Sequence, residues 1–416
     1  MTDTSQPPLW SDPTAPVGRR WLTPWTLVMM GMFGAYYAVA QIVLPEQAEQ
    51  ITDSDSAKVA LTAWATGLAA VVTFVVTITV GVVSDRTTHR RGRRYPWVVG
   101  GVMVMALGTM AQGWADEPWL VVACWSVVAV GYASGGSAIL AIVPDDVPVN
   151  QRAYVSAFYA MAMCLGPLLL IAAAVAVAGD LRVQYGVVAA LCLLMALPFA
   201  LRAKSVRLPV SERPEPQRLG QVLRSLVAPL RHADFTWAWL GRFGIQLSNA
   251  LAQMYLFFYL KDYVEVDDPD TAVLILTVLY AVSGTLAAIP AGRLSDRTMR
   301  RKRMVVISSV LQGAAGLILA FIPNMPAAAV GAIVLGAGYG VYAAVDQALI
   351  TQVLPDAHDR GKDLGIIGVA NILPYVLAAA LGGVVINLWG YPTLYVLVLV
   401  TGLLAAAAVQ PIRAVR

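Results

Sequence analysis

The chain has few charged residues and almost no cysteine or histidine. Only 13% of its 416 residues are charged, against roughly 25% in soluble domains, while 58% are hydrophobic. The three cysteines lie inside apolar runs without paired spacing, so neither a disulfide framework nor a cysteine metal site is predicted. The three histidines fall in predicted loops, which leaves carboxylates for any proton chemistry inside a membrane. The composition therefore indicates a polytopic membrane protein without a metal site.

The signatures of ATP-driven pumps and of common enzymes are also missing. No GxxxxGK[ST] phosphate loop occurs, and no Ser/His/Asp order or Cys/His cluster is present. The net charge of +4 could suggest nucleic acid, but in a membrane protein basic residues mainly record orientation. We therefore predict that the chain is not an enzyme, needs no cofactor, binds no nucleic acid and works as a monomer.

Long apolar runs divide the chain into twelve predicted membrane spans. Each is close to the roughly 20 residues that an α-helix needs to cross a bilayer. The predicted spans are residues 21–44, 57–83, 96–115, 118–143, 153–178, 183–201, 235–260, 271–292, 304–323, 326–354, 363–387 and 391–410. The sequence therefore predicts an all-α membrane protein.

Positive charges are distributed unequally between the two sides of this map. Of the 29 Lys and Arg residues, 25 fall at the termini, in the loops after even-numbered spans or in the linker 202–234. Because Lys and Arg accumulate on the cytoplasmic side of membrane proteins, both termini are predicted to be cytoplasmic, in a plasma or inner membrane.

The linker separates two halves that repeat each other. The string SDRT at 84–87 recurs at 295–298, and the pair PD at 144–145 recurs at 355–356, both 211 positions later. Duplicated six-span halves are typical of transporters. The predicted organisation is a disordered cytoplasmic segment, a first six-helix half, a cytoplasmic linker, a second six-helix half and a tail, at residues 1–20, 21–201, 202–234, 235–410 and 411–416.

The two copies of the SDRT string resemble the paired loop signatures of the major facilitator superfamily. The superfamily pattern has one residue between Asp-Arg and Gly-Arg-Arg, whereas five residues, 87–91, separate them in the first copy. This lengthened loop, which runs into Arg94-Tyr95-Pro96-Trp97, is similar to the sucrose-transporter and glycoside-pentoside-hexuronide branch, although Tyr95 replaces the usual arginine. The resemblance implies twelve helices in two pseudo-symmetric halves and transport by alternating access.

The same resemblance implies a cytoplasmic gate that closes when the halves meet. Asp85 would contact the start of the eleventh helix near 363–365, and Arg94 would reach Asp145. By the repeat, Asp296 would face the start of the fifth helix and Arg303 would reach Asp356. The predicted gate residues are Gly81, Asp85, Arg86, Arg94, Asp145, Gly292, Asp296, Arg297, Arg303 and Asp356. The alternative is that these arginines only set the membrane topology.

A carboxylate inside the tenth span is the most informative single residue. An ionised Asp at the centre of a membrane costs on the order of 2.5–3.5 kcal/mol, so Asp346 needs a partner or a function. Tyr339 and Tyr342 share its helix face by the spacing i, i+3, i+7. We predict that this face lines the substrate and ion cavity; the alternative is a structural ion pair.

Polar residues also form a stripe along the seventh span. Arg242, Gln246, Asn249 and Gln253 follow the spacing i, i+4, i+7, i+11. Arg242 is the predicted partner of Asp346, and the amides suit a polyol because they both donate and accept hydrogen bonds. The first and fourth spans add further candidates, Tyr36, Tyr37, Gln41 and Tyr132. The alternative is that the stripe packs against other helices.

These features predict a secondary active transporter for a small molecule. Proton-coupled symport of a sugar or glycoside is favoured, with sodium coupling open. A proton-coupled exporter of drugs or metabolites is the closest alternative, and Leu165-Gly166-Pro167 matches the core of its usual fifth-span motif without the outer glycines. A membrane sensor that does not transport is a third possibility, but the tails and linker are short for a signalling domain.

Overall fold

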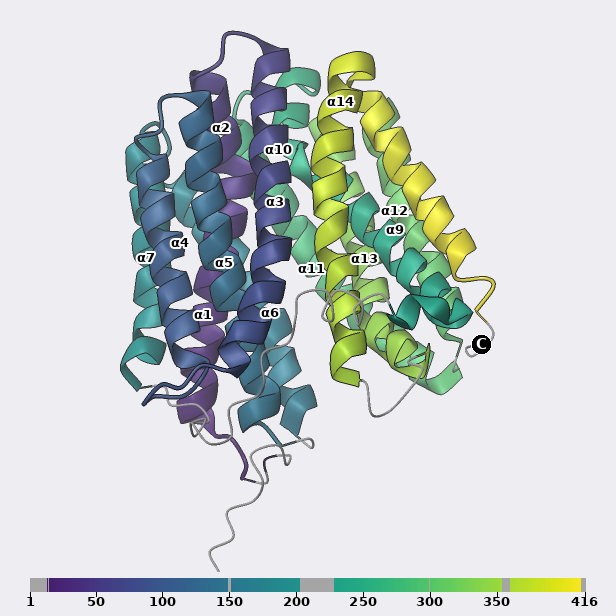
Figure 1. The fold of residues 1–416 in the computed structure, drawn as a ribbon. Helices are drawn as coiled ribbons and strands as arrows, with labels where there is room; N and C mark the ends of the chain where they lie inside the picture. Colours follow the sequence, from purple (N-terminus) through teal and green to yellow (C-terminus); the bar gives the residue numbers. More distant parts are fainter. Residues whose placement is uncertain are drawn as a thin grey trace, which may run out of the picture. The chain divides into compact units, whose positions relative to one another are not determined.

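The computed structural model describes residues 13, 15–148, 151–202, 228–298, 300–353 and 360–412, which form helices and short connections without a β-strand. The helices (Figure 1) are α1 (Arg19–Ala38), η1 (Val39–Val43), α2 (Leu44–Gln50), α3 (Asp55–Asp85), α4 (Tyr95–Gln112), α5 (Pro118–Asp146), α6 (Arg152–Val175), α7 (Leu181–Arg202), η4 (Ala228–Arg231), α9 (Ala233–Met254), α10 (Leu256–Phe258), η5 (Tyr259–Tyr263), α11 (Pro269–Thr298), α12 (Arg301–Phe321), α13 (Met325–Val353) and α14 (Arg360–Ala408). Among the described residues, eight helices are long and apolar enough to cross a membrane. The predicted all-α membrane fold is confirmed.

The first helix is longer than predicted. The apolar run suggested an end near Leu44, but a π-helical turn, η1, carries the helix into α2 and on to Gln50. Pro45, at the start of α2, has no N–H to donate to the carbonyl four residues earlier and would clash with it in a regular α-helix. A wider π turn directly before a proline relieves this conflict.

The element labelled α14 contains the last two predicted spans as two helices that meet at a sharp kink (Figure 1). Its only non-helical residue is Gly390, with φ 79° and ψ 177°, a conformation that favours glycine because it has no Cβ. Pro392 follows two residues later, at the start of the next helical segment, where the N–H that proline lacks is not needed for a hydrogen bond within the helix. The predicted break between residues 387 and 391 therefore lies at this glycine kink.

The chain divides into two compact units. The first contains residues 1–38, 75–114 and 124–216, and the second contains 39–74, 115–123 and 217–416. The division at residues 202–234 that the sequence predicts stays a prediction, because residues 203–227 lie outside the described residues.

In the first unit, α1 packs against α6 and α7, and α4 packs against α7. The helices approach one another at backbone level where glycines face each other. A Cβ placed on Gly34 of α1 would lie 2.5 Å from the carbonyl oxygen of Gly166 in α6. The indole of Trp25 also donates a hydrogen bond of 3.0 Å to the carbonyl of Ile139 in α5. Small residues and buried polar contacts thus hold this unit together without relying on the hydrophobic effect, which lipid weakens.

In the second unit, α9 packs against α14, α11 against α13, and α12 against both α13 and α14. The closest approach is between α11 and α13, at Gly284, Gly336 and Gly340. A Cβ on Gly284 would lie 3.0 Å from the carbonyl oxygen of Gly336, and a Cβ on Gly340 would overlap the backbone of Gly284. This glycine crossing brings the α11 and α13 backbones together beside the predicted cavity residues.

Candidate functional site

The second unit contains a buried ion pair between α9 and α13. The guanidinium of Arg242 donates a hydrogen bond from Nη1 to Oδ2 of Asp346. Both side chains are only 8% exposed. Each charge is therefore withdrawn from water and compensated by the other, which is the arrangement that a charged pair inside a membrane requires. The pairing predicted for Arg242 and Asp346 is present in the structure.

A series of tyrosines extends from this ion pair to the α9 stripe. Tyr342 lies one turn before Asp346 on the same face of α13, and its hydroxyl is buried. Its ring centroid is 6.0 Å from that of Tyr339, which in turn is 6.1 Å from that of Tyr280 in α11. The Tyr280 hydroxyl donates a hydrogen bond of 3.0 Å to Oδ1 of Asn249 in α9. We call Arg242, Asp346, Tyr342, Tyr339, Tyr280 and Asn249 the tyrosine chain.

The remaining predicted amides have different surroundings. Gln246 is buried in α9, at 8% exposure. Gln253, near the end of α9, is half-buried. Gln41 lies in the π turn η1, where its Oε1 accepts a contact of 3.5 Å from the Thr277 hydroxyl. Arg242, Gln246 and Asn249 therefore lie on a buried face of α9, and Gln253 lies at its half-buried end. That this stripe lines the substrate cavity stays a prediction.

Aromatic rings of α1 and α5 form a stack in the first unit. Tyr36 lies between Tyr132 and Trp125, with centroid distances of 4.3 Å and 5.0 Å and interplanar angles of 23° and 28°. Tyr37 meets Tyr36 edge-on at 5.9 Å, and Phe33 meets Tyr132 at 6.1 Å. We call Tyr36, Tyr132 and Trp125 the aromatic stack. It brings together the tyrosines that the sequence predicted from two separate spans.

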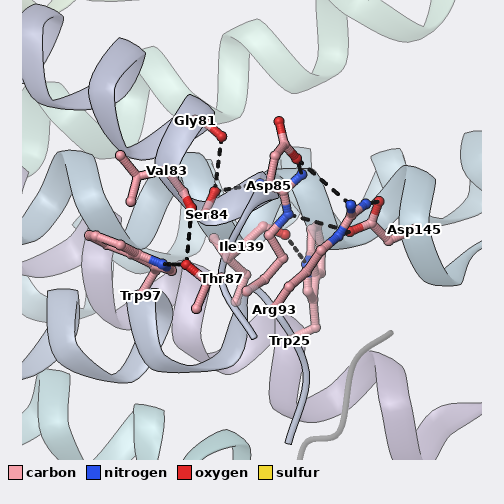
Figure 2. Close-up of polar contacts among 11 residues, drawn as sticks. Trp25, Gly81, Val83, Ser84, Asp85, Thr87, Arg93, Trp97, Ile139 and Asp145 are labelled. Carbon is pink, nitrogen blue, oxygen red and sulfur yellow. Dashed lines mark hydrogen bonds and ion pairs between the residues drawn. The ribbon is translucent and has the colours of Figure 1, made fainter. Parts of the chain in front are cut away.

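The first copy of the loop signature is built around Asp145, at the end of α5. Arg93 holds this carboxylate with two hydrogen bonds, Nε to Oδ2 at 3.0 Å and Nη2 to Oδ1 (Figure 2). Arg94 adds a third contact, Nε to Oδ2 at 3.3 Å, as predicted from the sequence. Both arginines are buried, at 5% and 6% exposure. A planar guanidinium that binds a carboxylate with two hydrogen bonds fixes both partners in orientation.

Arg94 connects this carboxylate to the end of α3. Its guanidinium also donates hydrogen bonds to the hydroxyl of Ser84 and to a carboxylate oxygen of Asp85. Ser84 is buried and donates a hydrogen bond of 3.1 Å to the carbonyl of Gly81 (Figure 2). We call Ser84, Asp85, Arg93, Arg94 and Asp145 the arginine cluster. Within the first unit it joins the end of α3, the start of α4 and the end of α5.

Other predicted gate residues are placed only in part. Arg86 follows the end of α3 directly, and Gly292 lies inside α11. Arg297 and Arg303 are exposed, at the end of α11 and the start of α12. Ser295 is buried at 2% exposure, as is its repeat counterpart Ser84 at 1%. The side chains of Asp296 and of residues 363–365, and the whole of Asp356, lie outside the described residues, so the contacts predicted for them stay predictions.

Sequence reasoning missed several residues that the structure connects to these sites. Arg93 was not assigned a partner, although it binds Asp145 with two hydrogen bonds. Tyr280 carries no periodic signal, because it is the single aromatic residue of α11. Trp125 lies seven residues before Tyr132 in α5, a spacing that puts both on one helix face and could have linked them. Lys58, near the start of α3, is 3% exposed and its Nζ lies 2.7 Å from Asp262, a pairing that spacing along one helix does not predict, and 3.0 Å from Asp55. The sequence did offer one indication that Lys58 is paired, because four acidic residues lie within twelve positions before it, Glu46, Glu49, Asp53 and Asp55.

A bundle of apolar helices with a duplicated arginine-rich loop and a buried ion pair defines a polytopic protein of the transporter class. The sequence profile of the Major Facilitator Superfamily matches residues 25–274 and 266–414. The chain therefore belongs to this superfamily, and membrane transport is its general function.

Solved transporters of this class have the same fold. A nucleoside transporter, NupG, is 12% identical with a TM-score of 0.74, covering 94% of this chain and 100% of its own. A peptide transporter, POT, is 12% identical with a TM-score of 0.73, covering 95% of each chain. A bacterial homologue of the human lysosomal transporter Spinster, in an inward-facing and unoccupied conformation, is 14% identical with a TM-score of 0.67 and 94% coverage of both chains. A comparison with curated protein sequences gives no significant match.

Proposed function

We propose that the protein is a proton-coupled symporter that takes up a sugar or a glycoside by alternating access. The observation that carries this proposal is the buried pair of Arg242 and Asp346, from which the tyrosine chain extends. Buried ionisable groups in membrane helices are rare and usually belong to substrate or ion pathways. The superfamily match supports secondary transport, and the chemistry of the side chains supports the substrate class.

The polar groups near the ion pair suit a substrate with many hydroxyls. Asn249 and Gln246 can each donate and accept, and the hydroxyls of Tyr280 and Tyr342 can do the same. The rings of Tyr280 and Tyr339, which lie in the same unit as the ion pair, offer flat apolar surfaces on which the C–H face of a sugar ring can lie. Amides and hydroxyls together with aromatic surfaces match a carbohydrate better than a lipophilic cation.

The ion pair also offers a route for coupling. While Asp346 is ionised, it holds the Arg242 guanidinium through a charged hydrogen bond. A proton on Asp346 removes the negative charge and leaves the guanidinium able to donate to a substrate oxygen. Proton binding and sugar binding would then favour each other, which is the thermodynamic requirement for symport.

The test is uptake by purified protein in proteoliposomes with an imposed pH gradient. The panel contains radiolabelled mono- and disaccharides, an aryl glycoside, a nucleoside, a dipeptide and a lipophilic cation. We expect accumulation of at least one sugar or glycoside, which a protonophore abolishes. Accumulation driven by a sodium gradient alone would show that sodium, and not a proton, is the coupling ion. Proton-driven movement of the lipophilic cation, with no sugar transported, would establish the exporter instead.

Asp346→Asn is expected to abolish proton-driven accumulation. The amide has nearly the same size and its oxygen can still accept a hydrogen bond from Arg242, but it cannot take up and release a proton. Less folded protein is expected, and in the protein that remains folded counterflow of substrate at equal pH should persist while the pH dependence is lost. The measurement is uptake across a series of external pH values, beside counterflow in the same vesicles. Asp267→Asn is the matched control, because Asp267 is an exposed loop carboxylate. An unchanged pH profile in Asp346→Asn would contradict the assigned role.

Tyr280→Phe and Asn249→Leu are expected to raise the KM for the transported sugar. Each removes one partner of the 3.0 Å hydrogen bond in the tyrosine chain. A hydrogen bond contributes about 0.5–1.5 kcal/mol, which corresponds to about a two- to twelvefold change in KM. The double variant should cost less than the sum of the two single variants, because the residues act through one contact. Additive effects would show that they bind independently or serve only helix packing.

A further inference from the structure

The lengthened loop of the first signature is anchored on the end of α7. Nη1 of Arg91 donates a hydrogen bond of 2.8 Å to the carbonyl of Ala200, and the hydroxyl of Tyr95 donates one of 2.6 Å to the same oxygen. Arg91 also donates to the Tyr95 hydroxyl, at 2.6 Å. Ala200 lies in the last turn of α7, which ends at Arg202. Carbonyls in a last turn have no N–H partner within their own helix and attract cations.

Ring stacking supports the same anchor. The imidazole of His89 stacks on Tyr95 at 5.6 Å and 8°, and Tyr95 stacks on Phe199 of α7 at 6.2 Å and 14°. The Arg91 guanidinium lies 5.2 Å from the centre of the Tyr95 ring. Tyr95 stands where related loops have arginine. Its hydroxyl and ring both contact the end of α7, so the residue that departs from the family pattern belongs to the anchor.

The second half has an equivalent contact at the repeat position. Lys302 lies 211 residues after Arg91, the same offset that relates the two SDRT strings. Its ammonium donates hydrogen bonds to the carbonyl of Ile412 and, at 3.3 Å, to that of Gln410. These carbonyls directly follow the end of α14 at Ala408. Arg91 lies in the loop before α4, whereas Lys302 is the second residue of α12. The two cations therefore start from different local structures, but each contacts carbonyls at the end of the last helix of its half, α7 or α14.

We propose that Arg91, together with Tyr95, and Lys302 are positioning residues that hold the gate arginines in place. Each ties its loop to the last helix of its own half and lies within three residues of a predicted gate arginine, Arg94 or Arg303. A segment fixed at one point loses less conformational entropy when the side chains next to it form pairs. The Arg91 anchor therefore favours the contacts that Arg93 and Arg94 make in the arginine cluster, and the Lys302 anchor restricts Arg303 in the same way. The gate role rests on the proposed transport function; the positioning of the arginines does not.

The competing explanation is that these cations only orient the chain in the membrane. Arg90 and Arg300 provide the comparison, because both are exposed arginines in the same two loops. The test variant is Arg91→Gln with Lys302→Gln, and its matched control is Arg90→Gln with Arg300→Gln. Both remove two positive charges from the same side, so any difference between them comes from the anchors. Arg91→Lys with Lys302→Arg keeps both charges and serves as the rescue variant.

The first readout is hydrogen–deuterium exchange of the full-length protein in lipid nanodiscs. We expect exchange in residues 92–98, which carry Arg93 and Arg94, to rise about two- to fivefold in the test variant, as loss of a cation at a helix end implies. The control should match the parent protein, and the rescue variant should restore most of the protection. Faster exchange only in residues 196–202 and 408–412, with 92–98 unchanged, would reduce the anchors to helix caps and overturn the proposal. Equal changes in test and control would overturn it as well.

The second readout is transport of the substrate identified from the uptake panel. The test variant should lower kcat about two- to fivefold with KM unchanged, because the anchors contact the loops and not the cavity residues. A normal kcat in a variant whose 92–98 segment exchanges faster would show that the positioning does not control the gate, and would overturn that part of the proposal. If the parent protein transports no member of the panel, the proposed substrate is wrong, while the exchange result still decides whether the anchors hold the arginines.

Discussion

Arg242→Met is expected to destabilise the protein by about 3–5 kcal/mol, the usual cost of leaving one charge of a buried pair without its partner. Asp346 is 6% exposed, and Arg242 is the cation bonded to its carboxylate. Methionine keeps an unbranched chain of similar length, so packing changes little while the charge is lost. The expected result is a large loss of folded protein at temperatures the parent survives.

The measurement is reversible denaturation in bicelles, with Arg242→Met, Asp346→Leu and the double variant compared. The double variant should recover most of the stability, because replacing both members of a buried pair by apolar groups is often neutral or stabilising. Recovery of stability without recovery of transport would separate the structural contribution of the pair from its proposed role in coupling. A double variant as unstable as the sum of the single variants would show that the two charges do not depend on each other.

Asp145→Asn is the second change with a large expected effect. Asp145 accepts hydrogen bonds from both Arg93 and Arg94, so the substitution leaves two buried guanidinium groups without their shared carboxylate. We expect a loss of about 3–5 kcal/mol in stability and at least a roughly tenfold slower transport rate, because the arginine cluster can no longer hold the ends of α3, α4 and α5 together.

The neighbouring Asp146→Asn is the matched control. Its carboxylate lies one residue away and accepts a hydrogen bond of 2.9 Å from the indole of Trp21, a neutral donor whose bond is weaker. We therefore expect a much smaller loss of stability and a nearly normal transport rate. Stability would be measured by thermal denaturation and transport by initial uptake rates in matched vesicles. Equal losses in the two variants would contradict a specific role for the pairing of Asp145 with the arginines.

Much of the fold could be predicted because the backbone polar groups of a chain in a bilayer must form their hydrogen bonds within the protein. Only helices and closed β-barrels satisfy every N–H and C=O group in lipid, and uninterrupted apolar runs of about 20 residues suit a helix, so the runs were predicted to be helical. Gly390 and Pro392 interrupt the last apolar stretch, and the structure has its kink at the glycine. The pairing of Arg242 with Asp346 was predictable for a related reason, since charges in adjacent membrane helices need compensation. The first span was the exception, because a π turn before Pro45 extends it.

The partners of single side chains were harder to predict, since periodicity describes one helix at a time. Arg93 and Arg94 are adjacent in sequence and both reach Asp145, but spacing alone gives no means of ranking them. Tyr280 joins the tyrosine chain only because of how α11 is rotated against α9 and α13, which depends on the packing of all three helices. The anchor of Arg91 on Ala200 joins residues 109 positions apart through a main-chain oxygen, a group that no sequence pattern distinguishes.

The glycine crossing of α11 and α13 has a consequence for changing what the protein transports. The separation of these helices is set by main-chain atoms at Gly284, Gly336 and Gly340, and not by the side chains around them. The distance between the α11 and α13 backbones therefore does not depend on the size of the Tyr280 and Tyr339 side chains. Libraries that vary these two positions should yield folded proteins with altered selectivity, whereas enlarging any of the three glycines should disrupt the glycine crossing itself.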